Sequence, residues 1–397
     1  MTICFVSYRT NNPYIGGIEN VTYSLCKEFT KRGYNVICIS QLDDKSQDYT
    51  PLCTELRFPN KKNIYNKDNL YFLEKVIKEN NVDIIINQYS INTGFSKLCH
   101  KIKEVFPYVM LITPLHFDLR HQLKAIENNC FIKIKNGTDI IMWAKGLLLF
   151  CKYHLYKKHI ILKQIKEHIE YIVETSDFVI PLTDNAKKDI INIYGGLNNH
   201  KFVTIGNPID IISRENNTKK KHIIYVGRIE YGLKRTDRII DIWQKLEKKN
   251  PDWNLFIVGD GPLRRHFEDI AHAKGLKRIY FEGFKDPAEY YQEALILCLT
   301  SSSEGFAKVI IEAQSYSCVP VAFNSFPALN DLITDGINGY KIRPFDKNEF
   351  VTKLQNLMND PNKCQIIGNN GRIQSEKFAL SAIVDKWENL FNQNFSR

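Results

Sequence analysis

Residues 296–313 read ILCLTSSSEGFAKVIIEA, which is an apolar run, a polar turn containing a glycine, and then an amphipathic segment. An apolar run of this length, bounded by turn residues, predicts a buried strand at Ile296–Thr300. The segment after the turn predicts a helix that begins close to Gly305. A strand, a short turn and a helix form the repeating unit of a parallel sheet that helices cover on both faces.

The same unit recurs along the chain in two groups. Near the amino terminus, Val21, Leu25 and Phe29 recur at helical spacing, and Gly33 supplies a C-cap. The predicted strands are Ile3–Ser7, Val36–Ser40, Ile84–Asn87, Met110–Thr113 and Phe178–Pro181 in the first group, and Ile223–Val226, Leu255–Val258, Ile279–Phe281, Ile296–Thr300 and Val319–Phe323 in the second. The sequence therefore predicts an α/β fold of two doubly wound, Rossmann-like domains facing each other across a cleft, with ligands beyond the carboxyl ends of the strands.

The second group of strands begins after a polar and basic stretch at residues 213–221, which suits an exposed linker. We therefore predict a first domain at residues 1–207 and a second at residues 208–380. Residues from about 119 to 174 break the rhythm, because they are helical in pattern and rich in lysine and aromatic side chains. We interpret them as a helical insertion in the first domain. The last helix, about 381–397, is predicted to join the first domain.

Composition narrows the class of protein. A chain of 397 residues is long enough for two domains with separate cores, and its formal net charge of +10 favours an anionic partner such as nucleic acid, a membrane surface or a phosphorylated ligand. The ten cysteines include no Cys-x-x-Cys pair, which is typical of a reduced compartment where cysteine serves as a small hydrophobe. No secretory signal is visible before Ile3, and the apolar tract Ile140–Cys151 is too short to span a bilayer. We expect a cytoplasmic protein.

The turn at residues 301–305 has the chemistry of a diphosphate site, because the amino end of a helix presents unpaired N–H groups and a positive dipole. Glu304 lies in this turn, and Glu312 is expected two helical turns further along. A carboxylate at either place can accept hydrogen bonds from a sugar or stabilise an oxocarbenium-like centre. On spacing alone, ordinary solvated helix glutamates remain the better interpretation.

Seven short motifs occur in a fixed order along the chain. They are Gly16-Gly17-Ile18-Glu19, His116 within residues 113–118, Val226-Gly227-Arg228 followed by Lys234, Gly259-Asp260-Gly261-Pro262, Glu282-Gly283-Phe284, the pair Glu304 and Glu312, and Asp335-Gly336 with Gly339. Each motif alone is weak, but the ordered set is specific. With it the chain resembles the retaining glycosyltransferases of family 4 (glycosyl transferases group 1), which have the GT-B fold and include bacterial glycan and lipopolysaccharide sugar transferases. The resemblance covers nearly the whole chain.

The resemblance implies a role for each matched residue. Arg228 and Lys234 would clamp the donor diphosphate, one as a bidentate guanidinium and the other as a point charge. His116 and Glu304 would be the catalytic pair that orients the donor sugar and stabilises the transition state. The remaining donor contacts would be Gly16 and Gly17 in the first loop, Phe284 at the base, Gly305 at the helix end, the backbone of Phe306 and Ala307, and Glu312 at the ribose.

Most of these residues also have a structural interpretation. Arg228 would then form an ion pair, Lys234 would lie on the surface, Gly16-Gly17 would be a simple turn, and His116 would be a structural histidine. The segment Gly259–Pro262 is interpreted as a tight structural loop, since it contains a proline and lacks the third glycine of a dinucleotide site. Because the chain has no Asp-x-Asp sequence, we expect no metal at the donor site and no other cofactor.

The predicted activity is transfer of a hexose or N-acetylhexosamine, with retention, from a nucleotide diphosphate sugar to a glycan or lipid-linked acceptor. We favour a UDP-sugar donor and a role in O-antigen, capsule or lipopolysaccharide biosynthesis. The alternatives are a GDP-mannose-dependent mannosyltransferase, a nucleotide-sugar epimerase or phosphorylase, and a non-catalytic nucleotide-binding protein. Nucleic acid is not an expected partner, because the interleaved basic and aromatic residues of nucleic-acid modules are missing.

One segment within the predicted insertion suggests peripheral contact with the inner membrane leaflet. Its apolar stripe is formed by Ile140, Ile141, Ala144, Leu147, Leu148, Cys151 and Leu155, with Lys145 and Lys152 at its margin and Lys157 and Lys158 beyond. Basic residues beside an apolar helix face suit an anionic membrane surface. The alternative is a helix that packs this stripe against its own domain.

Overall fold

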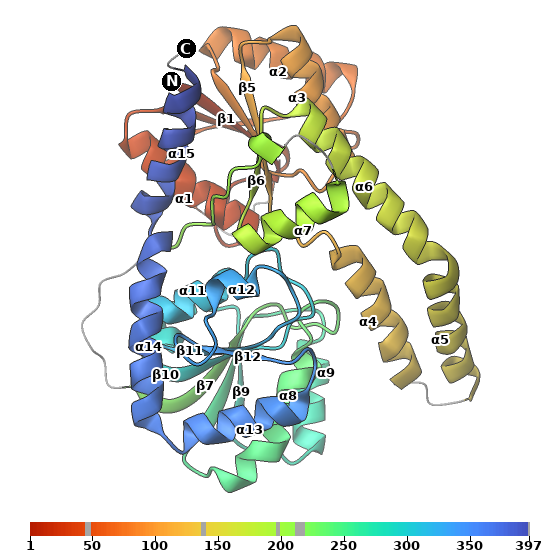
Figure 1. The fold of residues 1–397 in the computed structure, drawn as a ribbon, viewed down its shortest axis with the longest axis vertical. Helices are drawn as coiled ribbons and strands as arrows, with labels where there is room; N and C mark the ends of the chain where they lie inside the picture. The colour runs from red at the N-terminus through yellow and green to blue at the C-terminus, as the bar shows by residue number, and fades with distance from the viewer. Residues whose placement is uncertain (44–48, 136–139, 196–198, 211–218, 396–397) are drawn as a thin grey trace. The chain divides into compact units, whose positions relative to one another are not determined.

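The computed structural model describes residues 1–43, 49–135, 140–195, 199–210 and 219–395 (Figure 1). It divides into two compact units. Unit 1 contains residues 1–117, 164–210 and 377–397, and unit 2 contains residues 118–163 and 211–376. Most of the predicted linker at 213–221 lies outside the described residues.

Unit 1 is built on a sheet of six parallel strands in the order β3-β2-β1-β4-β5-β6. The strands are β1 Thr2–Arg9, β2 Asn35–Leu42, β3 Thr54–Arg57, β4 Ile84–Asn87, β5 Met110–Leu115 and β6 Phe178–Pro181. Ile3 of β1 is in register with Val36 on one side and Ile84 on the other. Because the strand order reverses between β1 and β4, the carboxyl ends of these two strands mark the topological switch point, where ligands bind in such sheets.

Helices flank this sheet, and local signals set their ends. They are α1 Gly17–Lys31, α2 Lys67–Asn80, α3 Thr93–Val105, α7 Asp184–Tyr194 and α15 Leu380–Phe395, with a 3-10 turn at Asn199–Lys201. The helix end predicted from Gly33 is confirmed, since Gly33, with φ at +86°, directly follows the C-cap residue Arg32. At the start of α7, Thr183 Oγ1 accepts a hydrogen bond from Ala186 N.

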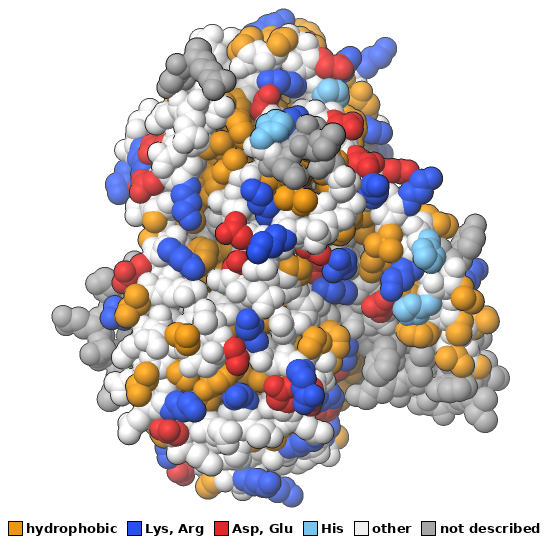
Figure 2. Space-filling view, in the orientation of Figure 1, with side chains coloured by type: hydrophobic (Ala, Val, Ile, Leu, Met, Phe, Trp, Pro, Cys, Tyr) orange, Lys and Arg blue, Asp and Glu red, His pale blue; other side chains and the backbone are white. Residues whose placement is uncertain are grey.

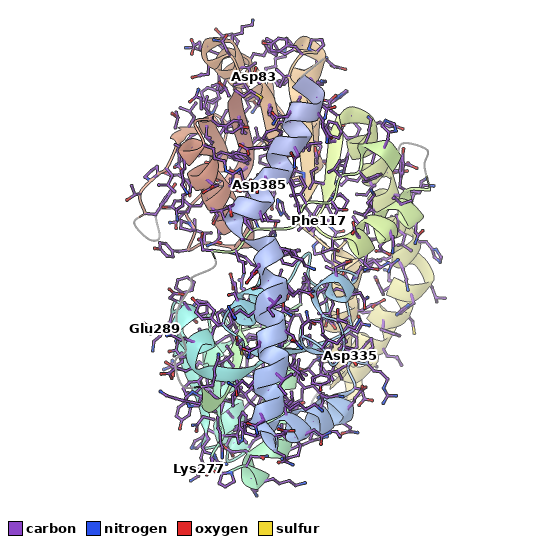
Figure 3. All side chains as sticks on the ribbon, turned by 60° about the vertical axis from the view of Figure 1, so that its left-hand side comes forward. Asp83, Phe117, Lys277, Glu289, Asp335 and Asp385 are labelled. Atoms are coloured by element: carbon purple, nitrogen blue, oxygen red, sulfur yellow. The ribbon has the colours of Figure 1, made fainter. Side chains whose placement is uncertain are left out.

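The last helix, α15, packs against α1 in unit 1. The ring centroids of Phe29 and Phe391 lie 5.8 Å apart. Arg32 Nη1 donates to Asp385 Oδ1 and to Glu388 Oε2, both at 2.6 Å, and Asp385 is labelled on α15 in Figure 3. Apolar stacking and a forked ion pair therefore connect the two ends of the chain.

Unit 2 repeats the architecture with a second sheet of six parallel strands, in the order β12-β11-β10-β7-β8-β9. The strands are β7 Lys220–Val226, β8 Asn254–Val258, β9 Ile279–Gly283, β10 Ala294–Leu299, β11 Val319–Phe323 and β12 Tyr340–Ile342. Ile223 of β7 is in register with Ile296 and with Leu255. The switch point of this sheet lies at the carboxyl ends of β7 and β10.

Unit 2 contains helices of its own, and the first two of them precede its sheet in the chain. They are α4 His121–Lys135, α5 Ile140–Lys152, α8 Thr236–Leu246, α9 Arg264–Ala273, α10 Ala288–Glu293, α11 Lys308–Ser315, α12 Leu329–Leu332, α13 Lys347–Met358 and α14 Pro361–Ser375, with 3-10 turns at Glu247–Lys249 and Glu376–Phe378. A π-helical turn at Tyr153–Lys157 connects α5 to α6, Lys158–Thr175, which begins in unit 2 and ends in unit 1.

The helical segment that the sequence analysis placed in the first domain divides differently in the structure. Residues 118–163 group with unit 2, and α4 and α5 run beside each other (Figure 1). Polar contacts explain this grouping, because Lys124 Nζ donates to Ser325 O at 2.7 Å and Asn128 Nδ2 donates to Gly232 O at 3.1 Å. These contacts are invisible in the spacing of residues along the chain.

The fold class is confirmed, and the predicted strands all occur. Three of them, β4, β6 and β11, have the predicted ends. The two strands that the sequence analysis missed, β3 and β12, are the short edge strands of the two sheets. β3 is mostly polar and partly exposed, and β12 has only three residues, so neither forms a clear apolar run. Among the described residues, no helix combines the length and apolar character needed to cross a bilayer.

Candidate active site

The loops that follow β7, β8 and β9 lie side by side at the carboxyl edge of the unit 2 sheet. Ile229 N donates to Asp260 O at 3.0 Å, and Gly259 N donates to Gly283 O at 2.8 Å. A Cβ on Gly259 would lie only 2.2 Å from Gly227 O, and φ of this glycine is +134°. Only glycine permits so close an approach. The segment Gly259–Pro262 is thus a tight structural loop, as predicted, and it supports the loop after β7.

The two cations of the predicted clamp are carried by that loop and its continuation toward α8. The Arg228 side chain is 67% exposed, and its Nε lies 3.7 Å from Glu230 Oε2. The other carboxylate oxygen of Glu230 accepts from Leu233 N at 3.2 Å, one residue before Lys234. Glu230 therefore contacts Arg228 and holds the backbone that carries Lys234.

Lys234 contacts Glu304, which follows β10. The Lys234 Nζ atom lies 2.8 Å and 3.0 Å from the two carboxylate oxygens of Glu304. Ser302 N donates to Leu233 O at 2.7 Å, so the backbones of the two loops are joined next to this ion pair. Two residues that the sequence analysis assigned to one site therefore touch each other.

The turn after Glu304 differs from the prediction, since α11 begins at Lys308 and not close to Gly305. Ala307 has φ at +59°, in the left-handed region, so the right-handed helix can only start after it. Phe306 and Ala307 are both buried, at 4% and 6% exposure. A buried residue other than glycine in this conformation is strained, and such residues cluster at binding sites.

Glu312 and Phe284, the predicted contacts of the ribose and the base, also belong to unit 2. Glu312 lies about one turn into α11, instead of the two turns expected, because the helix starts later. Its Oε1 is 3.2 Å from Lys308 Nζ, and its Oε2 accepts from Tyr291 Oη at 3.2 Å. Phe284 follows β9 and is 56% exposed, so its ring is accessible to a ligand.

The structure adds Asp118 to the candidate residues of unit 2. Its Oδ2 accepts from Ser303 Oγ at 2.7 Å and lies 2.6 Å from Lys124 Nζ, while its side chain is 1% exposed. A buried carboxylate requires such partners. Asp118 thus fixes the residue that precedes Glu304. The only available signal in the sequence was its position two residues after His116.

In unit 1, the two predicted glycines form the start of α1. Gly16 is the N-cap residue, and Gly17 is the first residue of the helix. A Cβ on Gly16 would lie 2.6 Å from Glu19 Oε2, the flexible end of that side chain. A Cβ on Gly17 would have no described atom within 4 Å. Packing within the chain therefore gives no reason for a glycine at position 17.

His116 directly follows β5 and lies, partly buried, next to Gln88, which follows β4. Its Nε2 lies 2.5 Å from Gln88 Oε1. An imidazole with its proton on Nε2 would donate to this amide oxygen and keep a lone pair on Nδ1. Burial lowers the pKa of His116 to about 4, so the imidazole is neutral at pH 7. Gln88 was not selected from the sequence, because nothing in its spacing distinguishes it.

Several buried polar atoms at this edge of the unit 1 sheet lack a hydrogen-bond partner among the described residues. They are Thr10 Oγ1, both side-chain polar atoms of Asn11, Gln88 Nε2 and His116 Nδ1. The residues that carry them follow β1, β4 and β5, and so surround the switch point of the sheet. Buried polar groups are normally satisfied, so this concentration marks a place where a polar ligand would complete them.

Comparison with known protein families assigns both parts of the chain. Residues 208–374 match the family described as Glycosyl transferases group 1, and residues 15–212 match the family described as Glycosyltransferase Family 4. The chain belongs to glycosyltransferase family 4. The resemblance that the sequence motifs carried is thereby confirmed, and with it the enzyme class.

This glycosyltransferase is similar to proteins from several bacteria. It is 26% identical over 379 residues to an uncharacterized glycosyltransferase of Haemophilus influenzae, covering 94% of this chain and 96% of that protein. It is 23% identical over 329 residues to the GalNAc-α-(1→4)-GalNAc-α-(1→3)-diNAcBac-PP-undecaprenol α-1,4-N-acetyl-D-galactosaminyltransferase of Campylobacter jejuni, covering 81% and 86%. Its fold matches the crystal structure of Anabaena Alr3699/HepE in complex with UDP, with a TM-score of 0.75, 17% identity, and 99% and 100% coverage.

The predicted site residues of this glycosyltransferase form two groups. Arg228, Lys234, Phe284, Glu304, Glu312 and the segment Gly305–Ala307 lie after the strands of unit 2, whereas Gly16, Gly17 and His116 lie after the strands of unit 1. Contacts within unit 2 join Lys234 to Glu304 directly. The roles of these residues toward a donor stay predictions.

Proposed function

We propose that this family 4 glycosyltransferase moves a hexose or N-acetylhexosamine from a UDP-sugar to a glycan or lipid-linked acceptor during surface polysaccharide assembly, with retention of configuration. Two similar proteins support the proposal. The Anabaena structure contains UDP, and the name of the Campylobacter jejuni enzyme describes transfer to an undecaprenol-linked glycan. We further propose that the protein works at the cytoplasmic face of the membrane, next to a lipid-linked acceptor.

The observation that carries the proposal is the arrangement of cations and carboxylates at the switch point of unit 2. Arg228 is exposed, and its pairing with Glu230 at 3.7 Å is worth little, so a diphosphate can displace Glu230 at small cost. Lys234 is less exposed and is held by Glu304. A diphosphate beside both cations would gain charge-assisted hydrogen bonds, and the same cations would stabilise the nucleotide as it leaves.

Glu304 and His116 are assigned to the sugar in this proposal. Glu304 would accept hydrogen bonds from sugar hydroxyls while the contact with Lys234 holds it in place. The neutral His116 would accept a hydroxyl hydrogen bond at Nδ1. No side chain among the candidate residues is an obvious nucleophile, so we propose front-face attack by the acceptor hydroxyl, without a covalent intermediate. Trapping of a glycosyl-enzyme adduct would contradict this mechanism.

Donor binding is the first part of the proposal to test. We expect UDP-sugars to raise the melting temperature of the purified protein by several degrees, since a ligand at 100 times its Kd adds about 2.7 kcal/mol of stability. Arg228→Ala should abolish the shift, whereas Arg343→Ala should keep it, because Arg343 is a similarly exposed arginine of unit 2 outside the site. A shift with GDP-mannose alone would favour the mannosyltransferase alternative.

Transfer is tested separately from binding. We expect release of free UDP to require an acceptor, and Glu304→Ala to lower the rate of release while leaving the UDP-induced shift in place. A nucleotide-sugar epimerase would change the sugar without releasing nucleotide, and a phosphorylase would require inorganic phosphate. We further propose that the donor site uses no divalent cation, so addition of Mg²⁺ or Mn²⁺ should leave the transfer rate unchanged.

Peripheral membrane contact is proposed for α5 and the π-helical turn after it. The described members of the predicted apolar stripe are exposed: Leu147 at 40%, Leu148 at 70% and Leu155 at 80%. Figure 2 shows hydrophobic side chains beside basic ones over this part of the molecule. The side chains of Ile140, Ile141 and Lys145 lie outside the described residues. An exposed apolar face with lysines at its margin suits an anionic leaflet.

Vesicle sedimentation tests this contact. We expect the protein to bind vesicles that contain phosphatidylglycerol, and the double variant Leu148→Ser/Leu155→Ser to bind at least tenfold more weakly. The matched control is Ile366→Ser/Ile373→Ser on α14, which removes two side chains of similar exposure, 64% and 62%, in the same unit. Equal binding by both double variants would contradict the assignment of α5.

A further inference from the structure

A group of three thiols lies in unit 1, away from the residues assigned to the donor. The Sγ atoms of Cys26 and Cys38 lie 3.3 Å apart, and those of Cys38 and Cys53 also lie 3.3 Å apart. All three cysteines are in the reduced form. Among the residues that the structure describes, these three form the single group of three histidine, cysteine or carboxylate ligand atoms that lie within 4.8 Å of one another.

Three separate elements bring these sulfur atoms together. Cys26 is on α1, Cys38 is on β2, and Cys53 immediately precedes β3. Cys38 is in register with Glu55 on β3, so Cys53, two residues earlier, faces the same side of the sheet. The thiol of Cys26 reaches this point from the helix above. The convergence is therefore a product of packing and is not a local sequence motif.

The chemistry of the group is that of a soft metal site. We infer that Cys26, Cys38 and Cys53 together bind one thiophilic cation with a filled d shell, Zn²⁺ or Cu⁺. Three thiolates select these ions, whereas Mg²⁺ and Ca²⁺ require oxygen ligands. Zn–S bonds of about 2.3 Å would place the sulfurs ~3.8 Å apart, which requires an expansion of about half an ångström.

Burial and access suit such a site. Cys26 and Cys38 are 1% and 3% exposed, while Cys53 is half-buried and lies outside any helix or strand. Cys53 therefore gives a metal ion access from solvent. Its position outside any helix or strand also lets its thiol move to a coordinating distance. The nearby Glu55 is not offered as a ligand, because its carboxylate accepts from Tyr49 Oη at 2.6 Å and lies 3.1 Å from Arg57 Nη2. The remaining coordination position would belong to water or stay vacant.

A bound cation would connect α1 to β2 and to the edge of the sheet. α1 begins at Gly17, so the same helix carries the predicted donor loop at one end and a metal ligand in its third turn. The site is distinct from the donor site, at which we propose no metal. Its expected contribution is to the stability of unit 1, because metal binding that requires the folded arrangement adds to the free energy of folding.

Metal content of the purified full-length chain tests the inference. We expect about one equivalent of zinc or copper by inductively coupled plasma mass spectrometry, and the element found distinguishes the two ions. After removal with a thiol-compatible chelator, Co²⁺ should restore sulfur-to-metal charge-transfer absorption. Cys38→Ala and Cys53→Ala should each weaken Zn²⁺ binding by at least ~100-fold, since loss of a supporting residue alone costs up to that much.

The matched control is Cys99→Ala, which removes a buried thiol of unit 1 outside the group and should leave metal binding unchanged. Cys53→Ala is the decisive variant, because its partial exposure makes misfolding an inadequate explanation of metal loss. The inference would be overturned if the purified protein retained no metal and also failed to compete for Zn²⁺ with a chelator of micromolar affinity. So would a disulfide within this group in the freshly purified protein, detected as two cysteines that take up an alkylating reagent only after reduction.

Discussion

The charged side chains of the candidate site in unit 2 are already paired, so a ligand there must exchange partners rather than fill an empty space. Lys234 is bound to Glu304, and Glu312 is bound to Lys308 and Tyr291. Such pairs hold charged groups in place before a ligand arrives and reduce the entropy lost on binding. Arg228 differs, since it is mostly exposed and must become ordered.

His116 provides a prediction that depends on pH. Its pKa in the folded protein is about 4, below the usual value of about 6.5, because burial disfavours the imidazolium. The unfolded chain therefore binds the extra proton between these values, and stability falls as the pH drops below about 6.5. We expect His116→Gln to remove this penalty. The free energy of unfolding of the variant minus that of the wild type should therefore be about 2 kcal/mol larger at pH 5 than at pH 7.5.

Urea unfolding of both proteins at the two pH values measures this difference. The other buried histidines of the chain are common to both proteins and cancel in the comparison. A free-energy difference between variant and wild type that stays the same at both pH values would show that His116 is not kept neutral by the fold.

Gly17 allows function and stability to be separated. Because a Cβ at this position would meet no described atom within 4 Å, Gly17→Ala should fold with unchanged or slightly raised stability. If a donor approaches the backbone here, the added methyl group should raise the KM for the donor at least tenfold. Thermal melting and initial rates with varied donor measure the two effects. An unchanged KM would remove Gly17 from the site.

Among the secondary-structure elements, α1 has contacts at both ends. Its first residue belongs to the predicted donor loop, and its C-cap residue Arg32 reaches α15. The Arg32 guanidinium also donates to Ser381 O, so it connects the last helix to unit 1 by three separate acceptors. The Arg32 side chain thus holds the last helix, α15, against α1.

We expect Arg32→Ala to lower the free energy of unfolding by about 1–2 kcal/mol, because it leaves two carboxylates of α15 without their partner. Arg343→Ala is the control, since Arg343 also pairs with two carboxylates but is 76% exposed, and it should cost about 0.5 kcal/mol or less. Urea titration monitored by tryptophan fluorescence compares the two. Equal effects would mean that α15 is held by its apolar contacts alone.

The molecule as a whole consists of two units with their own sheets and cores, and the candidate residues are divided between them. We expect UDP to slow amide exchange selectively at residues 226–235 and 300–312 of unit 2, where the proposed nucleotide contacts lie. An intact UDP-sugar should add protection near Gly17 and His116, because these two candidate donor contacts lie in unit 1. Hydrogen–deuterium exchange with mass spectrometry measures both.

Exchange with adenosine 5′-diphosphate in place of UDP is the control for nonspecific stabilisation of a basic protein. Protection spread evenly over both units with UDP would contradict the division of roles. Protection confined to unit 1 would place the nucleotide at the other sheet.

Local patterns in the sequence were sufficient for the fold class. The apolar runs of β1 and β10, the helical period of α1 and the cap at Gly33 each involve residues close together in the chain, so their signals survive without knowledge of the rest. β3 was missed because its residues are mostly polar and at least partly exposed, and β12 was missed because it has only three residues. The motifs around Arg228 and Glu304 identified the family because their order along the chain is itself specific.

Other features exist only once the chain has packed. The pairing of Lys234 with Glu304, the burial of Asp118 against Ser303 and the contact of Gln88 with His116 each join residues from different loops. Hydrophobic period determines which face of an element is buried, but it does not determine which side chains of two elements meet. For the same reason, the convergence of the three thiols could not be predicted from the sequence. At positions 26, 38 and 53 they are unremarkable in sequence, and only the packing of α1 on β2 and β3 brings their sulfur atoms to one point.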